Sequence, residues 1–211
     1  MNQTVPPSPQ PPRVPKAAFS ATLQALPTSA LQFLDDARFC IRGAEMHLGA
    51  VRMILARTGS VALEELTWHT RSVFWELIGA WDLFLMWATE RHDLRMKGQR
   101  LRHHEVTINN VFSSTSSDPA WPGIRQILYE TVESPWLFEL REYRNLAHKW
   151  VIGSERLIVQ KTATTHYMLP LARVGQDRLD LYTQLDLYVG QMIALGEKLD
   201  PRWQIPNVSG R

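Results

Sequence analysis

The residues with the clearest chemical potential lie in one short stretch, LREYRNLAHKW, at positions 140–150. Its polar members include Arg141, Arg144, Asn145 and His148. Arginine binds phosphate and carboxylate oxygens through a planar fork of N–H donors, and histidine exchanges a proton near neutral pH. Such a group could bind and cleave a phosphate ester, or it could be a structural network of salt bridges that holds helices together.

Helical geometry predicts that these side chains lie at the border between core and surface. At about 100° per residue, the apolar residues of the stretch share one arc centred near Leu140. Arg144 falls inside that arc, Arg141 and His148 stand at its edge, and Asn145 lies a little further out. A pair of half-buried arginines repels itself unless anions neutralise it. We therefore expect carboxylates of the protein, or phosphates of a ligand, next to these arginines.

Glu76, on the preceding long helix, is the best candidate for an acidic partner. With Leu77 on the core side of that helix, Glu76 and His69 both lie at the core edge. Glu76 could pair with Arg141 or Arg144 and orient it within a site. Equally, Glu76 and His69 could be structural hydrogen-bonding residues.

A second cluster of positive charge occupies RHDLRMKGQRLRHH, at positions 91–104. Its candidates for binding RNA are Arg95, Lys97, Arg100 and Arg102. Such a patch could contact the phosphates of a nucleic acid. It could also be the solvated end of a helix, where cations favour the negative end of the helix dipole.

The sequence contains few of the residue patterns that are typical of metal, cofactor or nucleophile chemistry. The histidines include no Glu-x-x-His pair of the kind that binds di-iron centres in helical bundles. His47, His69 and His148 could still meet at a mononuclear site between facing helices, so a metal-dependent bundle enzyme stays an alternative. P-loop, dinucleotide-fingerprint, paired-cysteine and nucleophile-elbow motifs are absent. We expect no metal and no cofactor.

The elements that must position these residues are mainly helices. Apolar residues recur in steps of three and four from Leu34 to Leu55, which is typical of the buried seam of a long helix. A second long helix is predicted over 61–95, and apolar side chains surround most of it. A helix of that kind lies at the centre of a bundle or at a subunit interface.

The second half of the chain is predicted to add shorter elements. The sequence predicts short helices at 122–132 and 135–151, the second with Pro135 in its first turn. RLIVQKT and HYMLPLA resemble the strands of a small β-hairpin, and a last helix is expected over 177–199. Together these elements predict a mainly α fold. It is an antiparallel up-down bundle of about four long helices, with short extra helices and a possible small β-hairpin before the last helix.

The chain suits one domain with a tail at each end. Among its 211 residues, we expect the bundle over 28–200 and a disordered, proline-rich tail over 1–27. A C-terminal tail is expected over 201–211, with Trp203 packed back onto the domain.

Composition favours a soluble protein of the cytoplasm. The net charge of +2 does not by itself indicate a nucleic-acid partner. The only cysteine, Cys40, fits a reducing cytosol. The most apolar segment, 77–88, is too short to cross a bilayer and contains Asp82, so we expect no membrane association.

The stretch at 140–150 resembles the motif of the HEPN superfamily, α-helical domains found in toxin–antitoxin, phage-defence and RNA-processing systems. Its signature is an arginine followed, after a short interval, by a histidine, and Arg141 and His148 match it with six residues between them. Arg144 followed by Asn145 resembles the arginine–polar pair of the motif, at one residue less than its commonest distance from the histidine. The order of helices and hairpin also resembles one branch of the family, largely of unknown function.

This resemblance implies an RNA-binding domain or a metal-independent endoribonuclease. His148 would handle the proton of the ribose 2′-OH or of the leaving oxygen, and the arginines would stabilise charge on the phosphate. Asn145 and Glu76 would complete the site. Active members of the family usually form homodimers around one RNA-binding cleft, and an antitoxin protein could be a further partner. The competing hypothesis is a non-enzymatic interaction protein with a structural Arg/His/Glu network.

Overall fold

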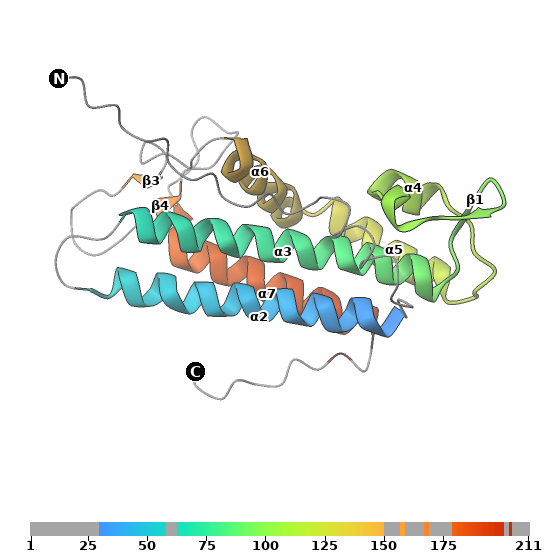
Figure 1. The fold of residues 1–211 in the computed structure, drawn as a ribbon, viewed down its shortest axis with the longest axis horizontal. Coiled ribbons are helices and arrows are strands. Elements are labelled where there is room, and N and C mark those ends of the chain that lie inside the picture. Colours follow the sequence, from blue (N-terminus) through green and yellow to red (C-terminus); the bar gives the residue numbers. More distant parts are fainter. Residues whose placement is uncertain are drawn as a thin grey trace, which may run out of the picture.

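A computed structural model describes residues 30–57, 63–149, 157–158, 167–168, 179–200 and 203 (Figure 1). Its longer helices are α2 (Ala30–Leu55), α3 (Leu63–Arg91), α5 (Trp121–Val132), α6 (Pro135–Lys149) and α7 (Leu181–Leu199). They pack as a bundle, which confirms the mainly α fold. The predicted tails lie outside the described residues, apart from Trp203. In the described part of the chain, no helix is long and apolar enough to cross a membrane.

The antiparallel pair α2 and α3 supplies most of the core. The predicted seam of α2 is buried from Leu34 to Val51, and Leu55 is half-buried. The apolar surface around α3 is explained by its position, because α3 packs against α2, α4, α6 and α7. Leu77 and Ile78, which lie about 100° apart around α3, are both buried.

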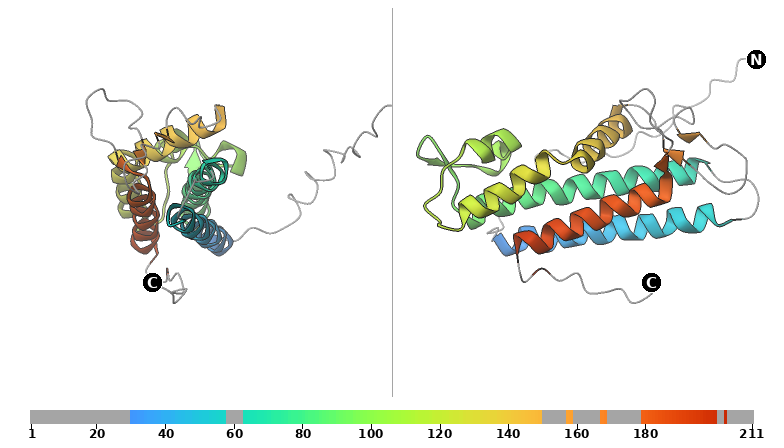
Figure 2. Two further views of the ribbon diagram at one scale, coloured as in Figure 1. Left: turned by 90° about the vertical axis from the view of Figure 1, so that its left-hand side faces the viewer. Right: turned by 180° about the vertical axis from the view of Figure 1, so that it is seen from behind.

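The helices α5, α6 and α7 form the other side of the bundle. α6 lies over α3 and α7, on the side of α3 away from α2 (Figure 2). Pro135 begins α6 as predicted, because proline at the first position loses no helical hydrogen bond. The buried hydroxyl of Tyr188 on α7 donates to Glu139 of α6 over 3.0 Å. This bond and the buried Leu137 and Leu140 fix how α6 is turned.

The prediction of a helix up to residue 95 was wrong at its end. α3 stops at Arg91, and Asp93 has a φ of 44°. This left-handed conformation cannot continue a right-handed helix. The helix therefore ends before the arginine-rich cluster, and Leu94, which follows the break, is fully buried.

The arginine-rich cluster forms a hairpin instead. Strands β1 (Arg95–Met96) and β2 (Gln99–Arg100) pair antiparallel, and the turn residues Lys97 and Gly98 have φ values of 53° and 80°. Two left-handed residues are what a tight two-residue hairpin turn requires. A 3-10 turn (His103–Glu105) and the short helix α4 (Ile108–Ser113) follow, which the sequence analysis did not predict.

The hairpin predicted before the last helix is confirmed. β3 (Leu157–Ile158) pairs antiparallel with β4 (Tyr167–Met168). A third strand, β5 (Leu179–Asp180), adds to β4 and was not predicted. Asp180 also begins α7, because its carboxylate accepts a hydrogen bond from the backbone N–H of Thr183 over 2.8 Å.

Trp203 packs back onto the bundle, as predicted. It is 4% exposed, its ring lies 5.3 Å from that of Phe84, and the guanidinium of Arg38 lies 4.9 Å from its centre. Gly196 makes room for it, since a Cβ there would lie 2.3 Å from the indole. No side chain larger than hydrogen fits at position 196 without moving Trp203.

Candidate functional site

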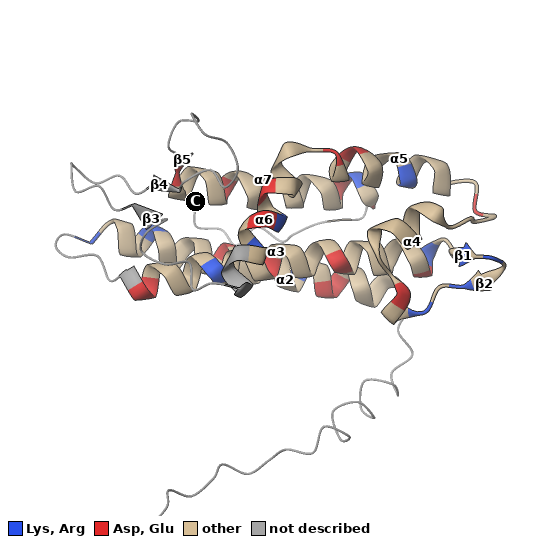
Figure 3. Ribbon diagram, turned by 90° about the horizontal axis from the view of Figure 1, so that it is seen from above, with Lys and Arg blue, Asp and Glu red and all other residues tan. Residues whose placement is uncertain are grey.

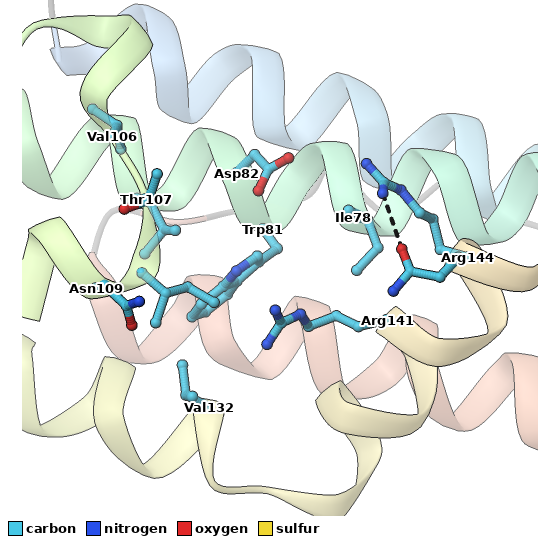
Figure 4. Close-up of a pocket in the computed structure, with 12 residues that line it drawn as sticks. Ile78, Trp81, Asp82, Val106, Thr107, Asn109, Val132, Arg141 and Arg144 are labelled. Atoms are coloured by element: carbon cyan, nitrogen blue, oxygen red, sulfur yellow. Dashed lines mark hydrogen bonds between the residues drawn. The ribbon is translucent and has the colours of Figure 1, made fainter. Parts of the chain in front are cut away.

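A cavity of about 510 Å³ lies between α3, α6 and the start of α4 (Figure 4). Its apolar wall includes Ile78, Trp81, Leu85 and Val132, and its polar residues are Asp82, Thr107, Asn109, Arg141, Arg144 and Asn145. Three of the predicted site residues, Arg141, Arg144 and Asn145, therefore border one cavity.

The packing of α6 explains how these side chains reach the cavity. Leu137, Leu140 and Tyr143 are buried, and the ring of Tyr143 stacks on Phe74 of α3 at 5.3 Å. This anchoring leaves Arg144 half-buried beside α3, while Arg141 is exposed. Arg144 thus lies at the border of core and surface, as predicted, whereas Arg141 is more exposed than the predicted border position.

Arg144 is held in place by contacts other than salt bridges. Its guanidinium lies over the ring of Trp75, 5.1 Å from the ring centre, and one of its terminal N–H groups donates to Oδ1 of Asn145 over 3.2 Å. Its Nε is buried and has no hydrogen-bond partner among the described residues. Arg144 is therefore oriented without an ion pair to any described carboxylate.

Arg141 extends across the cavity towards Trp81 (Figure 4). Within the described ranges it takes part in no hydrogen bond or ion pair. An arginine in such a position can bind an incoming anion without first breaking a salt bridge.

Asp82 is the carboxylate that shares the cavity with the arginines. Its side chain is exposed. Neighbouring protein atoms still remove part of the water around its carboxyl group, which raises its pKa above the ordinary 3.8, and the charges of Arg144 and Arg141 partly oppose that rise. Among the described residues, Asp82 forms no ion pair with either arginine. The cavity thus contains two arginine cations and one aspartate that forms an ion pair with neither of them.

Glu76 does not pair with Arg141 or Arg144, so that part of the prediction was wrong. It faces α2, where a Cβ on Gly43 would lie 3.0 Å from its carboxyl carbon. Burial, and next the charge of Glu76, raise the pKa of Cys40 to about 11. Successive residues of a helix point about 100° apart. Trp75 therefore faces α6, whereas Glu76, the next residue, faces α2.

Asp82 is the site residue that the sequence analysis missed. It follows Ile78 by one turn and Trp75 by two, so all three face α6. The available signal was an acidic residue inside the most apolar segment, 77–88, where a charge needs a reason.

His148 belongs to α6, but its side chain lies outside the described residues. The structure therefore leaves its catalytic role as a prediction. Of the other histidines named as conceivable metal ligands, His47 and His69 do meet, with their Nδ1 atoms 2.9 Å apart. No group of three or more metal-binding side chains occurs in the part of the chain that is described.

The arginines of the hairpin segment are exposed but each lies against a carboxylate. The pairs are Arg95 with Asp93, Arg100 with Glu90, and Arg102 with Glu105. Basic residues lie along β1 and β2 at this end of the bundle, and acidic residues lie on the neighbouring segments (Figure 3). Lys97, at the turn, has no ion pair with any described residue. Binding of RNA by these four residues stays a prediction.

No protein-family model, no curated protein and no solved structure matches this chain. Fold and cavity define it as a helical-bundle protein with a solvent-open cavity that carries two arginines.

Proposed function

We propose that the cavity beside α6 binds RNA through its phosphate groups, and that the chain is a metal-independent endoribonuclease of the HEPN type. One observation carries this proposal: Arg141 and Arg144 border the same open cavity, and neither is neutralised by an ion pair within the described residues. A purely structural network would instead have covered both charges with carboxylates.

The cavity can hold one nucleotide with its phosphate on the arginines. Its volume of about 510 Å³ lies within the range of small-molecule sites. A phosphate between Arg141 and Arg144 gains charge-assisted hydrogen bonds from both. Thr107 and Asn109 on the opposite wall supply further polar groups for the sugar.

Asp82 adds a preference for ribose. A carboxylate only accepts hydrogen bonds, and the 2′-OH of RNA can donate one. DNA has no such donor, so next to Asp82 it would meet only the repulsion between the carboxylate and its own phosphates. His148 then takes or supplies the proton during cleavage, and no metal takes part.

A cleavage assay with the full chain tests this function. We expect cleavage of single-stranded RNA that persists in excess chelator and falls by about 100-fold or more in His148→Ala, since general acid–base catalysis contributes roughly that much. RNA binding should survive in this variant. His104→Ala, which changes an exposed histidine of the 3-10 turn, is the matched control. Cleavage that requires Mg²⁺, or that is unchanged in His148→Ala, would contradict the nuclease mechanism, and a failure to bind RNA would contradict the whole proposal.

The proposal includes a homodimer, for which the outer face of α2 offers a surface. Phe39, Met46 and Met53 are spaced seven residues apart on one face, and Phe39 is 76% exposed. Asp35 lies four residues before Phe39 and Arg57 four after Met53. This sequence of side chains is self-complementary about Met46, as two antiparallel copies of α2 require.

In that antiparallel pairing Phe39 meets Met53 of the second copy, and Asp35 meets Arg57. Asp35 and Arg57 now form exposed pairs with Arg38 and Glu65, which exchange partners at little cost. The helix α2 lies on the side of α3 away from α6 (Figure 2). The two cavities would therefore stay apart, unlike the shared cleft that the resemblance implies.

Sedimentation of the native chain and of Met46→Glu tests this dimer. On the two-fold axis the glutamate faces its own copy, so we expect the variant to be monomeric at concentrations where the native chain is dimeric. Leu187→Glu changes an exposed apolar residue on α7 and should leave the dimer intact. A monomeric native chain, or a Met46→Glu dimer, would refute the α2 interface.

A further inference from the structure

Two tryptophans of α3 lie exposed beside the arginine cavity. Trp68 is 63% exposed, and Trp75 keeps 41% exposure although a guanidinium lies over its ring. The two residues are seven positions apart, so their side chains leave nearly the same side of the helix, about 10 Å apart along its axis. Exposed apolar side chains that lie together mark a contact surface for a partner or a ligand.

Arginines lie along the same side of the molecule. Arg71 lies between the two tryptophans, about one turn from each, and is half-buried. Among the described residues it forms no ion pair. At Trp75 the guanidinium of Arg144, from α6, lies 5.1 Å from the centre of the ring. Indoles and arginines thus alternate along an indole strip, which consists of Trp68, Arg71 and Trp75.

The indole strip is continuous with the cavity. Arg144 contacts Trp75 and also borders the cavity. Asp82, another residue of the cavity wall, follows Trp75 by seven positions and therefore lies on the same side of α3. From Asp82 to Trp68 the helix extends about 20 Å, and the exposed acid Glu64 lies one turn beyond Trp68. A strand held in the cavity by its phosphate can therefore continue along α3 as far as Trp68.

We propose that the indole strip binds the nucleotides next to the one in the cavity, by stacking their unpaired bases on Trp68 and Trp75. This inference rests on the proposed RNA binding in the cavity and names the feature that selects single strands. Every base has an aromatic face, so stacking tolerates any sequence. The bases of a duplex are paired and stacked on one another, so a duplex gains nothing from the indoles.

Charge favours a nucleic acid over a protein segment as the occupant. An apolar segment on the two indoles would cover Arg71 and Arg144 without neutralising them, which costs free energy. The phosphates between stacked bases neutralise both arginines. Alternation of aromatic and basic side chains is how single-stranded nucleic acids are bound without reading of their sequence.

Fluorescence anisotropy with the full chain and two labelled RNAs tests the strip. A dinucleotide can fill only the cavity, whereas an oligomer of about eight nucleotides can also reach along α3. We expect the native chain to bind the oligomer more tightly. Trp68→Leu should weaken binding of the oligomer by about 5- to 100-fold, the effect of one lost stack, and leave the dinucleotide unchanged. Tyr129→Leu, an exposed aromatic residue of α5, is the matched control and should bind both RNAs as the native chain does.

The two RNAs separate this inference from the function on which it rests. If the native chain bound neither RNA, the proposed function of the cavity would be wrong, and the strip with it. If it bound both, and Trp68→Leu bound the oligomer equally well, the strip alone would be refuted. A change in the sedimentation of Trp68→Leu without a change in its RNA affinity would also refute the strip, because the indoles would then form a protein interface.

An abasic nucleotide tests the stacking itself, with the native protein. Placed at successive positions of the oligomer, it removes one base and keeps the charge of the backbone. At one position we expect it to weaken native binding by about 5- to 100-fold and to have no further effect in Trp68→Leu. Native binding that is insensitive to every abasic position would overturn the proposal, even if Trp68→Leu had lost its helical circular dichroism.

Discussion

Two groups of arginines in this molecule differ in what their charges face. In the hairpin segment after α3, Arg95, Arg100 and Arg102 each lie against a carboxylate. On α6, Arg141 faces an open cavity and Arg144 lies on the ring of Trp75. The hairpin segment is richer in positive charge, but α6 has more charge available to an anion. Density of basic residues in a sequence is therefore a poor guide to an anion site.

The difference arises from the local geometry of the two segments. Asp93 and Glu105 lie two and three residues from the arginines they bind, so the hairpin segment neutralises itself. The nearest acid before Arg141 is Glu139, and its carboxylate accepts hydrogen bonds from Tyr188 and Gln184 of α7. Glu139 is thus held against α7 and forms no ion pair with either arginine.

The largest expected effect comes from replacing one arginine of each group by glutamine. A hydrogen bond to a charged group contributes about 1.5–3 kcal/mol, so Arg141→Gln should weaken RNA binding by about tenfold or more. Arg102→Gln should change it by about twofold at most, because Arg102 already bonds Glu105. Fluorescence anisotropy over a range of salt concentrations measures both.

The salt dependence separates a lost phosphate contact from a loss of structure. Removal of one contact lowers the slope of log K against log salt by about one. We expect that change in Arg141→Gln and a native slope in Arg102→Gln. The reverse order would mean that the hairpin segment, not α6, binds the RNA.

The helices were predictable because their apolar periodicity records burial directly. The seam from Leu34 to Leu55 and the first turn at Pro135 both appear where the sequence predicts them. The end of α3 was missed because the segment after Arg91 is rich in charged residues, which a helix end tolerates. The helix ends at the left-handed Asp93, and the hairpin turns at the left-handed Lys97 and Gly98. Lys-Gly was the only local signal of that turn.

The site was predictable to the extent that it lies on one helix. Angles along α6 predicted that Arg141 and Arg144 lie near one another beside the core, and both border the same cavity because they project from one regular helix, although Arg141 is exposed. The acidic partner required knowing which face of α3 meets α6. The apolar surface around most of α3 left that face undetermined, so Glu76 and Asp82 could not be distinguished.

Asp82→Asn should change nucleic-acid binding by less than Arg141→Gln does, and it should strengthen DNA binding rather than weaken it. The substitution removes the negative charge of Asp82 from beside the phosphate site. The repulsion that it removes is roughly 0.5–1 kcal/mol, so DNA binding should tighten by about two- to fivefold. RNA should gain less, because it also loses the carboxylate that accepts its 2′-OH.

The pH dependence of DNA binding tests whether the Asp82 carboxylate is what repels DNA. The pKa of Asp82 is raised above its ordinary value by the surrounding protein, so the group gains its proton at a higher pH than a free aspartate. As the pH falls towards that pKa, the repulsion disappears and DNA binding by the native chain should approach that of Asp82→Asn. A gap that stays constant with pH would show that the carboxylate is not what repels DNA.

The smallest expected effect tests whether a paired arginine can be made available. Glu105→Gln removes the acid that binds Arg102, so RNA affinity should rise, by about twofold at most for an exposed pair. Acid alone would not achieve this, because the hydrogen bonds from Arg102 lower the pKa of Glu105 to about 2. If the freed arginine strengthened binding as much as Arg141→Gln weakens it, the hairpin segment would have to lie on the RNA path. Local pairing, rather than position in the fold, would then be what distinguishes the two groups.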